Sequence, residues 1–241
     1  MLFSAMGQRL REPVITNLMT RALEDPEMLS LAAGFTDNNT LPLELVAKAT
    51  QSLLGSGADP EVLQYGTNQG RAGLRKAVAE RGSNQFGESA EAWRAKDILV
   101  SQGAQQALYL AMQTLADPGD FVLVERPTYF VFLEMLAGLG IEARSIPADA
   151  GGNINFSALR KLLSDWTDKG EIDRLKAVYH VSYYSNPSGR SLSDESKRKL
   201  GKVFAEINHP LPVIEDAAYR DLYHTAPFPA PSILSIEEYG D

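Results

Sequence analysis

Residues 177–189 read Ala-Val-Tyr-His-Val-Ser-Tyr-Tyr-Ser-Asn-Pro-Ser-Gly, and residues 212–219 read Pro-Val-Ile-Glu-Asp-Ala-Ala-Tyr. In both stretches a short apolar run typical of a β-strand leads directly into polar residues. The pattern therefore places Asn186, Asp216 and Tyr219 near the carboxyl ends of strands, where open α/β sheets bind their ligands. A carboxylate, an amide and a phenol at one sheet edge can hold the ring nitrogen and the ring hydroxyl of a heteroaromatic ligand.

Strands and helices alternate outward from these two stretches. We expect strands at 98–100, 121–124, 142–146, 175–181 and 212–214, and helices at 105–116, 129–139, 156–166 and 194–207. Two further helices are expected at 42–54 and 72–81, with Gly82 close to the end of the second. This order predicts an α/β fold with three αβα layers, in which helices cover both faces of a mostly parallel sheet.

The first forty residues lack this alternation. Pro13, Pro26 and the loop Gly34-Phe35-Thr36-Asp37-Asn38-Asn39 break any long element there. We therefore expect an N-terminal arm or linker over residues 1–40 and one large domain over residues 41–241.

The composition is that of a folded globular chain, with 241 residues, 44% hydrophobic and 22% charged. The formal net charge of −8, with Lys and Arg scattered, argues against nucleic acid as a partner. No apolar run approaches the roughly 20 residues that span a bilayer, and the first residues lack a signal-peptide pattern. We therefore expect no membrane partner and a cytoplasmic location. The chain has no cysteine, and its three histidines lack ligand spacing, so no metal site is predicted.

Other candidate site residues have two interpretations each. Ser101-Gln102-Gly103-Ala104-Gln105 leads from a strand into a helix, where free amides attract an anion such as phosphate, although a glycine at such a turn is common. Tyr129 follows a proline turn, where it could contact a ligand or pack on the core. Asn-Pro-Ser-Gly could be a simple turn, and the pair Glu215-Asp216 could serve a metal or a helix cap. Glu215 points to the other side of its strand and is expected to be a surface or supporting acid.

Taken together, these motifs resemble the class I/II aminotransferases, the aspartate-aminotransferase-like enzymes of pyridoxal 5′-phosphate (PLP) fold type I. The resemblance runs from about residue 30 to residue 241, with the motifs in the family's order. It implies the major domain of the PLP-dependent transferase fold, truncated at its C-terminus. It also implies that Gly103, Ala104 and Gln105 bind the phosphate, Tyr129 stacks on the ring, Asn186 and Tyr219 bond the phenolic oxygen, and Asp216 keeps the ring nitrogen protonated.

More distant residues share the resemblance. Tyr65, in Leu63-Gln64-Tyr65-Gly66, matches a tyrosine that reaches the phosphate of the neighbouring subunit, which implies a homodimer for the full-length protein. Gly34 matches a loop near the substrate carboxylate, which Asn186 would also approach. In this family a lysine downstream of the Asp-x-x-Tyr strand holds PLP as a Schiff base, and here no lysine follows Lys202. We therefore expect the catalytic lysine and the small C-terminal domain beyond Asp241, and we expect the 241-residue chain alone to be inactive.

The resemblance predicts an aminotransferase that moves an amino group from an α-amino acid to a 2-oxo acid. Another PLP reaction on the same scaffold, such as that of a C–S lyase or a decarboxylase, stays open. So does the non-catalytic, ligand-sensing domain of a regulator, although residues 1–40 are short and poor in basic residues for a DNA-binding helix-turn-helix. A nucleotide-binding doubly wound domain would need a Gly-x-Gly-x-x-Gly turn, and Gly103 stands alone.

Overall fold

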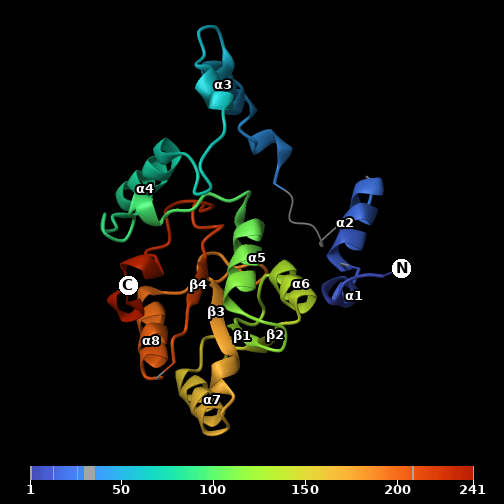
Figure 1. Ribbon diagram of the computed structural model, residues 1–241, viewed down its shortest axis with the longest axis vertical. Coiled ribbons are helices and arrows are strands. Elements are labelled where there is room, and N and C mark those ends of the chain that lie inside the picture. The colour runs from blue at the N-terminus through green and yellow to red at the C-terminus, as the bar shows by residue number, and fades with distance from the viewer. Residues whose placement is uncertain (1, 13, 26, 30–35, 208, 241) are drawn as a thin grey trace. The chain divides into compact units, whose positions relative to one another are not determined.

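A computed structural model describes residues 2–12, 14–25, 27–29, 36–207 and 209–240 (Figure 1). The chain forms two compact units, one made of Met1–Arg11 with Ala72–Asp241 and the other of Glu12–Arg71. The smaller unit contains the helices α2 (Val14–Glu24) and α3 (Leu43–Leu54) and two 3₁₀ turns, Asn38–Thr40 and Pro60–Leu63. Helix α3 matches the predicted helix at 42–54, with Pro42 at its N-cap. Residues 1–40 contain α2 and also the short α1 (Ala5–Arg9), neither of which the sequence pattern predicted.

The larger unit contains the sheet and most of the helices. Its strands are β1 (Phe121–Val124), β2 (Glu142–Ser145), β3 (Leu175–Val181) and β4 (Val213–Asp216). Its helices are α1, α4 (Ala72–Phe86), α5 (Ala104–Leu115), α6 (Phe130–Leu139), α7 (Phe156–Asp168) and α8 (Asp194–Ala205), with 3₁₀ turns at Ala95–Asp97, Ile172–Arg174, Ile233–Ser235 and Glu237–Tyr239. No helix in the described ranges is long and apolar enough to cross a membrane.

The four strands form one parallel sheet in the order β2-β1-β3-β4. Side chains of β1 and β3 enter two separate cores, one on each face of the sheet. The alternation is regular along β1, whereas a register shift at the start of the β1–β3 ladder places Leu175 on the same side as Val178. Phe121, Leu123, Leu175 and Val178 pack with α7 and α8, whereas Val122, Val124, Ala177 and Tyr179 pack with α5 and α6. Because both faces are covered, β1 is buried along its whole length. The predicted three-layer α/β fold is confirmed.

Two predictions about local structure are wrong. Residues 98–100 form no strand, and within the described chain the sheet ladder does not reach them. A strand exists only when a neighbour accepts and donates its backbone hydrogen bonds, so an apolar β-rich sequence is insufficient. Gly82 does not end its helix either. It is buried inside α4, where the ring of Trp93 packs so closely that an added Cβ would lie 2.2 Å from Trp93 Cδ2.

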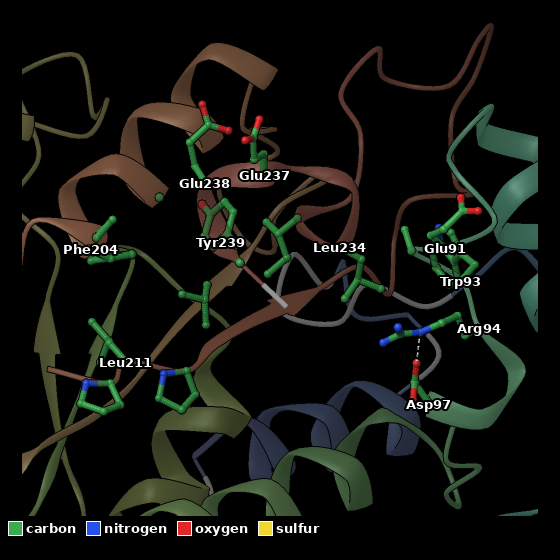
Figure 2. Close-up of a pocket in the computed structure, with 18 of the residues that line it drawn as sticks. Glu91, Trp93, Arg94, Asp97, Phe204, Leu211, Leu234, Glu237, Glu238 and Tyr239 are labelled. Carbon is green, nitrogen blue, oxygen red and sulfur yellow. Dashed lines mark hydrogen bonds and ion pairs between the residues drawn. The ribbon is translucent and has the colours of Figure 1, made fainter.

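A groove of about 1250 Å³ lies beside the start of β4, between α8 and the segments 91–98 and 233–240. Figure 2 shows Phe204 and Leu211 on one wall, and Trp93 with the ion-paired Arg94 and Asp97 on the other. Val213, at the start of β4, also lines the groove, whereas Asp216 does not. This groove therefore lies away from the polar residues at the carboxyl edge of the sheet.

Candidate functional site

The carboxyl edge of the sheet brings together polar residues from three parallel strands. Tyr129 follows β1 at the start of α6, Asn186 follows β3, and Asp216 is the last residue of β4, with Tyr219 three residues further on. Val181 pairs with Asp216 across the β3–β4 ladder, so both strands end at the same level. These four predicted residues are all partly buried.

Hydrogen bonds hold the Asp216 carboxylate on both of its oxygens. Oδ1 accepts the backbone N–H of Ala218 at 3.0 Å, and Oδ2 accepts the hydroxyl of Tyr179 at 2.8 Å. The ring of Tyr179 is fully buried and stacks on Phe132, with 3.9 Å between the ring centroids. Burial, followed by the charge of Asp216, raises the pKa of the Tyr179 phenol far above its ordinary value. Tyr179 is therefore held more firmly than a free tyrosine in its protonated form, which donates the hydrogen bond to Asp216.

Tyr219 and Asn186 meet beside this carboxylate. The Asn186 side-chain amide donates to the Tyr219 hydroxyl over 3.4 Å, a long contact that a ligand oxygen between them could replace. Tyr129 and Tyr219 pack against the same apolar cluster as Tyr179. Partial burial, then the nearby Tyr219 and Asp216, raise the pKa of the Tyr129 phenol. Tyr129, Tyr219 and Asp216 are therefore close enough to interact electrostatically at the carboxyl edge of the sheet.

Helix α5 begins beside the same core with an open N-terminus. Gly103 occupies the N-cap with φ of 89°, a left-handed conformation that favours glycine. Within the described chain no side chain caps this helix, and nothing lies within 4 Å of where a Cβ would stand at Gly103. Ala104 and Gln105 are exposed, so the first amides and the positive end of the helix dipole are free to receive an anion.

The structure does not test the roles predicted for Tyr65 and Gly34. Tyr65 belongs to the smaller unit, where it follows the 3₁₀ turn Pro60–Leu63 and is 94% exposed. Gly34 lies outside the described residues.

Glu215 is expected to be either a surface or a supporting acid, and the surface position is wrong. Its side chain is only 6% exposed and pairs with the fully buried Lys197, whose Nζ donates to Glu215 Oε1 at 2.6 Å. Burial by itself would raise the pKa of the Glu215 carboxyl, but the charge of Lys197 and several smaller contributions, including hydrogen bonds from Lys197 and Ser182, together lower this pKa. The sequence showed correctly that Glu215 faces the other side of the sheet from Asp216. It could not show that α8 covers that side.

A second buried ion pair joins Glu88 to Arg220. Ser232 links the two pairs, because its N–H donates to Glu88 Oε1 at 2.8 Å and its hydroxyl donates to Glu215 Oε2, also at 2.8 Å. These interactions connect β4 with α8 and with the segment after α4, on the side of the sheet opposite to the Asp216 side chain. Such partners are distant in sequence, and no local pattern could have revealed them.

The donors and acceptors at the carboxyl edge suit one flat, polar ligand. A paired carboxylate can hold a protonated ring nitrogen, the Asn186 amide and the Tyr219 hydroxyl can hold a ring oxygen, and the α5 amides can hold a phosphate. The residues present therefore fit a phosphorylated pyridine with a ring hydroxyl.

An open αβα sheet with this edge defines a ligand-binding α/β domain. The sequence places it more closely: the chain belongs to the aminotransferase class I and II family, whose model matches residues 26–241. It is 29% identical to aromatic-amino-acid aminotransferase 1 of Thermococcus litoralis over 98% of this chain and 54% of that protein. It is 28% identical to an uncharacterized HTH-type transcriptional regulator of Escherichia coli, over 89% of this chain and 43% of that protein.

Among solved structures, a multiple substrate aminotransferase from Thermococcus profundus superposes with a TM-score of 0.79. The two are 28% identical, and the match covers 97% of this chain and 55% of that one. The chain thus spans about half the length of the curated relatives that it matches.

Proposed function

We propose that this chain carries the PLP-binding part of an aminotransferase that transfers an amino group from an α-amino acid to a 2-oxo acid. The observation that supports this best is the Asp216 carboxylate, which both Tyr179 and the Ala218 amide orient at the end of β4. When bound, PLP supplies an electron sink that stabilises negative charge on the substrate carbon while its ring nitrogen carries a proton.

Each residue of the edge then has a definite task. Asp216 holds the proton on the ring nitrogen, since a close negative charge favours the protonated form. Asn186 and Tyr219 hold the phenolic oxygen, and Tyr129 covers the face of the ring. The amides of Gly103, Ala104 and Gln105 bind the phosphate.

The rest of the proposal concerns the whole protein. A lysine and a small domain beyond Asp241 would complete the active site. Tyr65 would reach the phosphate across a homodimer, and Gly34, with Asn186, would lie near the substrate carboxylate. The support for a further segment is that relatives bearing aminotransferase names are about twice as long as this chain. We accordingly expect no aminotransferase turnover from residues 1–241 alone. A cytoplasmic location belongs to the same proposal.

A second candidate function is ligand sensing without catalysis. The E. coli relative is named as a transcriptional regulator, and the region it shares with this chain is less than half of its own length. The same edge would bind the cofactor in either case. Turnover by a version completed through the lysine would favour the enzyme.

Binding of pyridoxamine 5′-phosphate to the 241-residue chain tests the proposed site. We expect the parent chain to bind this ligand saturably, as measured by tryptophan fluorescence. Asp216→Asn should lower the affinity by about tenfold or more, because the amide keeps the shape of the side chain and removes its charge. Asp173→Asn, which alters an 88% exposed carboxylate, is the matched control and should bind normally. Equal binding by Asp216→Asn and the parent chain would contradict the assignment.

A further inference from the structure

We propose that Tyr179 is a positioning residue, which acts on the cofactor through Asp216. This inference rests on the proposed function, because it concerns how the same carboxylate is presented to the ring nitrogen. Tyr179 lies in the interior of β3, opposite Ile214 rather than Asp216, and reaches Asp216 Oδ2 diagonally with its hydroxyl, over 2.8 Å.

The tyrosine itself has little freedom to move. Its side chain is fully buried, and its ring stacks on Phe132 with an interplanar angle of 27°. Val122 and Ala177 belong to the same buried cluster. The hydroxyl is therefore a fixed point from which the carboxylate is oriented, in contrast to a donor on a mobile loop.

The carboxylate is oriented because each oxygen has its own donor. A rotation about the Cβ–Cγ bond of Asp216 would take Oδ2 away from Tyr179 and Oδ1 away from the Ala218 amide. Such a rotation would leave the phenol, which is buried, without an acceptor, and a buried unpaired donor is costly. Tyr179 thereby selects one carboxylate orientation before any ligand arrives.

Tyr179 also keeps its hydrogen bond to Asp216 over a wide range of pH. Burial and the charge of Asp216 raise the pKa of the Tyr179 phenol, so the donated proton is not lost as the pH rises. The ring nitrogen of a bound pyridine would meet an oriented negative charge, which is what keeps that nitrogen protonated.

The test compares two ligands and three proteins, which are the parent chain, Tyr179→Phe and a control variant. Pyridoxamine 5′-phosphate, and an analogue in which the ring nitrogen is replaced by C–H, are each titrated into the parent 241-residue chain and into Tyr179→Phe. We expect Tyr179→Phe to lower the affinity for pyridoxamine 5′-phosphate about tenfold and to leave the affinity for the analogue nearly unchanged, because only the first ligand has a nitrogen to protonate. Circular dichroism and a thermal melt check that the variant is folded.

Tyr183→Phe is the matched control. Tyr183 is also fully buried, but its hydroxyl donates to the carbonyl of Ala230 at 3.1 Å and accepts from Lys197, away from Asp216. Both affinities should survive this change. Equal losses for the two ligands in Tyr179→Phe, or no loss for either, would overturn the role of Tyr179 while leaving the proposed function intact. Failure of the parent chain to bind pyridoxamine 5′-phosphate would overturn both.

Discussion

At the scale of single residues, His180 shows what burial does to an ionisable group. Its side chain is 1% exposed, Nδ1 shares a hydrogen bond of 2.8 Å with Ser182 Oγ, and Nε2 has no partner among the described residues. Burial lowers the pKa of the imidazole from 6.5 to about 4, although Glu215 opposes this shift and Lys197 adds to it. The folded protein therefore keeps His180 neutral in mild acid.

This difference predicts a dependence of stability on pH. Between pH 6.5 and about 4 the unfolded chain protonates His180 and the folded chain does not, so the unfolded state binds more protons and stability falls as the pH falls. Stability from this source is complete above pH 6.5, and about 3 kcal/mol is lost by pH 4. The free energy of unfolding, measured with urea at several pH values, should depend less steeply on pH in His180→Gln than in the parent chain. His224→Gln, which changes an exposed imidazole, should follow the parent.

At the scale of an element, α4 depends on a glycine inside the helix. Gly82 lets the ring of Trp93 lie against the helix backbone, and the indole N–H of Trp93 donates to Glu88 Oε2 at 2.7 Å. Glu88 in turn pairs with Arg220. Because glycine has no side chain, Trp93 can contact α4 here, and Glu88 then connects Trp93 to Arg220 in the segment after β4.

Gly82→Ala should therefore destabilise the protein, although alanine is the better helix former. The new methyl group would displace the Trp93 ring at a cost of about 1–3 kcal/mol and break its hydrogen bond at a further cost of about 1 kcal/mol. Together these costs exceed the helix-propensity gain of about 1 kcal/mol. Gly73→Ala in the same helix is the matched control. Nothing lies within 4 Å of its Cβ position, so it should be neutral or stabilise by up to about 1 kcal/mol. Chemical unfolding measures both, and a stabilised Gly82→Ala would show that Trp93 does not pack as described.

At the scale of the whole molecule, the described sheet has two edge strands, β2 and β4, and β4 begins at Val213 beside the groove of Figure 2. An edge strand presents unpaired N–H and C=O groups, and here apolar side chains such as Leu211 and Leu234 lie beside it. Leu234 is 59% exposed. This edge therefore offers a place where another strand could pair.

We expect the 241-residue chain to self-associate through this edge as its concentration rises. Leu234→Lys puts a charge in the groove and should shift sedimentation velocity profiles toward monomer. Leu110→Lys, at a 45% exposed leucine of α5 outside the groove, is the control and should associate like the parent chain. A parent chain that stays monomeric at every concentration would contradict this prediction.

Local sequence pattern determined a large part of this structure. The two-residue and 3.6-residue periods placed β1, β3, α6 and α7 within one or two residues of their observed bounds, since periodicity records which side of an element is buried. Because polar residues stand at or just beyond the carboxyl ends of β3 and β4, Asn186, Asp216 and Tyr219 could be placed at one sheet edge.

Only the tertiary structure decided what these elements pair with. The bond from Tyr179 to Asp216 and the ion pair between Lys197 and Glu215 join residues 37 and 18 positions apart in sequence. Residues 98–100 have the composition of a strand and form none, and Gly82 has the position of a helix stop and serves packing. The physical reason is the same for these two side-chain interactions, for residues 98–100 and for Gly82. A side chain's own chemistry and spacing are local, whereas a hydrogen-bond partner, a buried counter-charge or a neighbouring strand exists only once distant segments have come together.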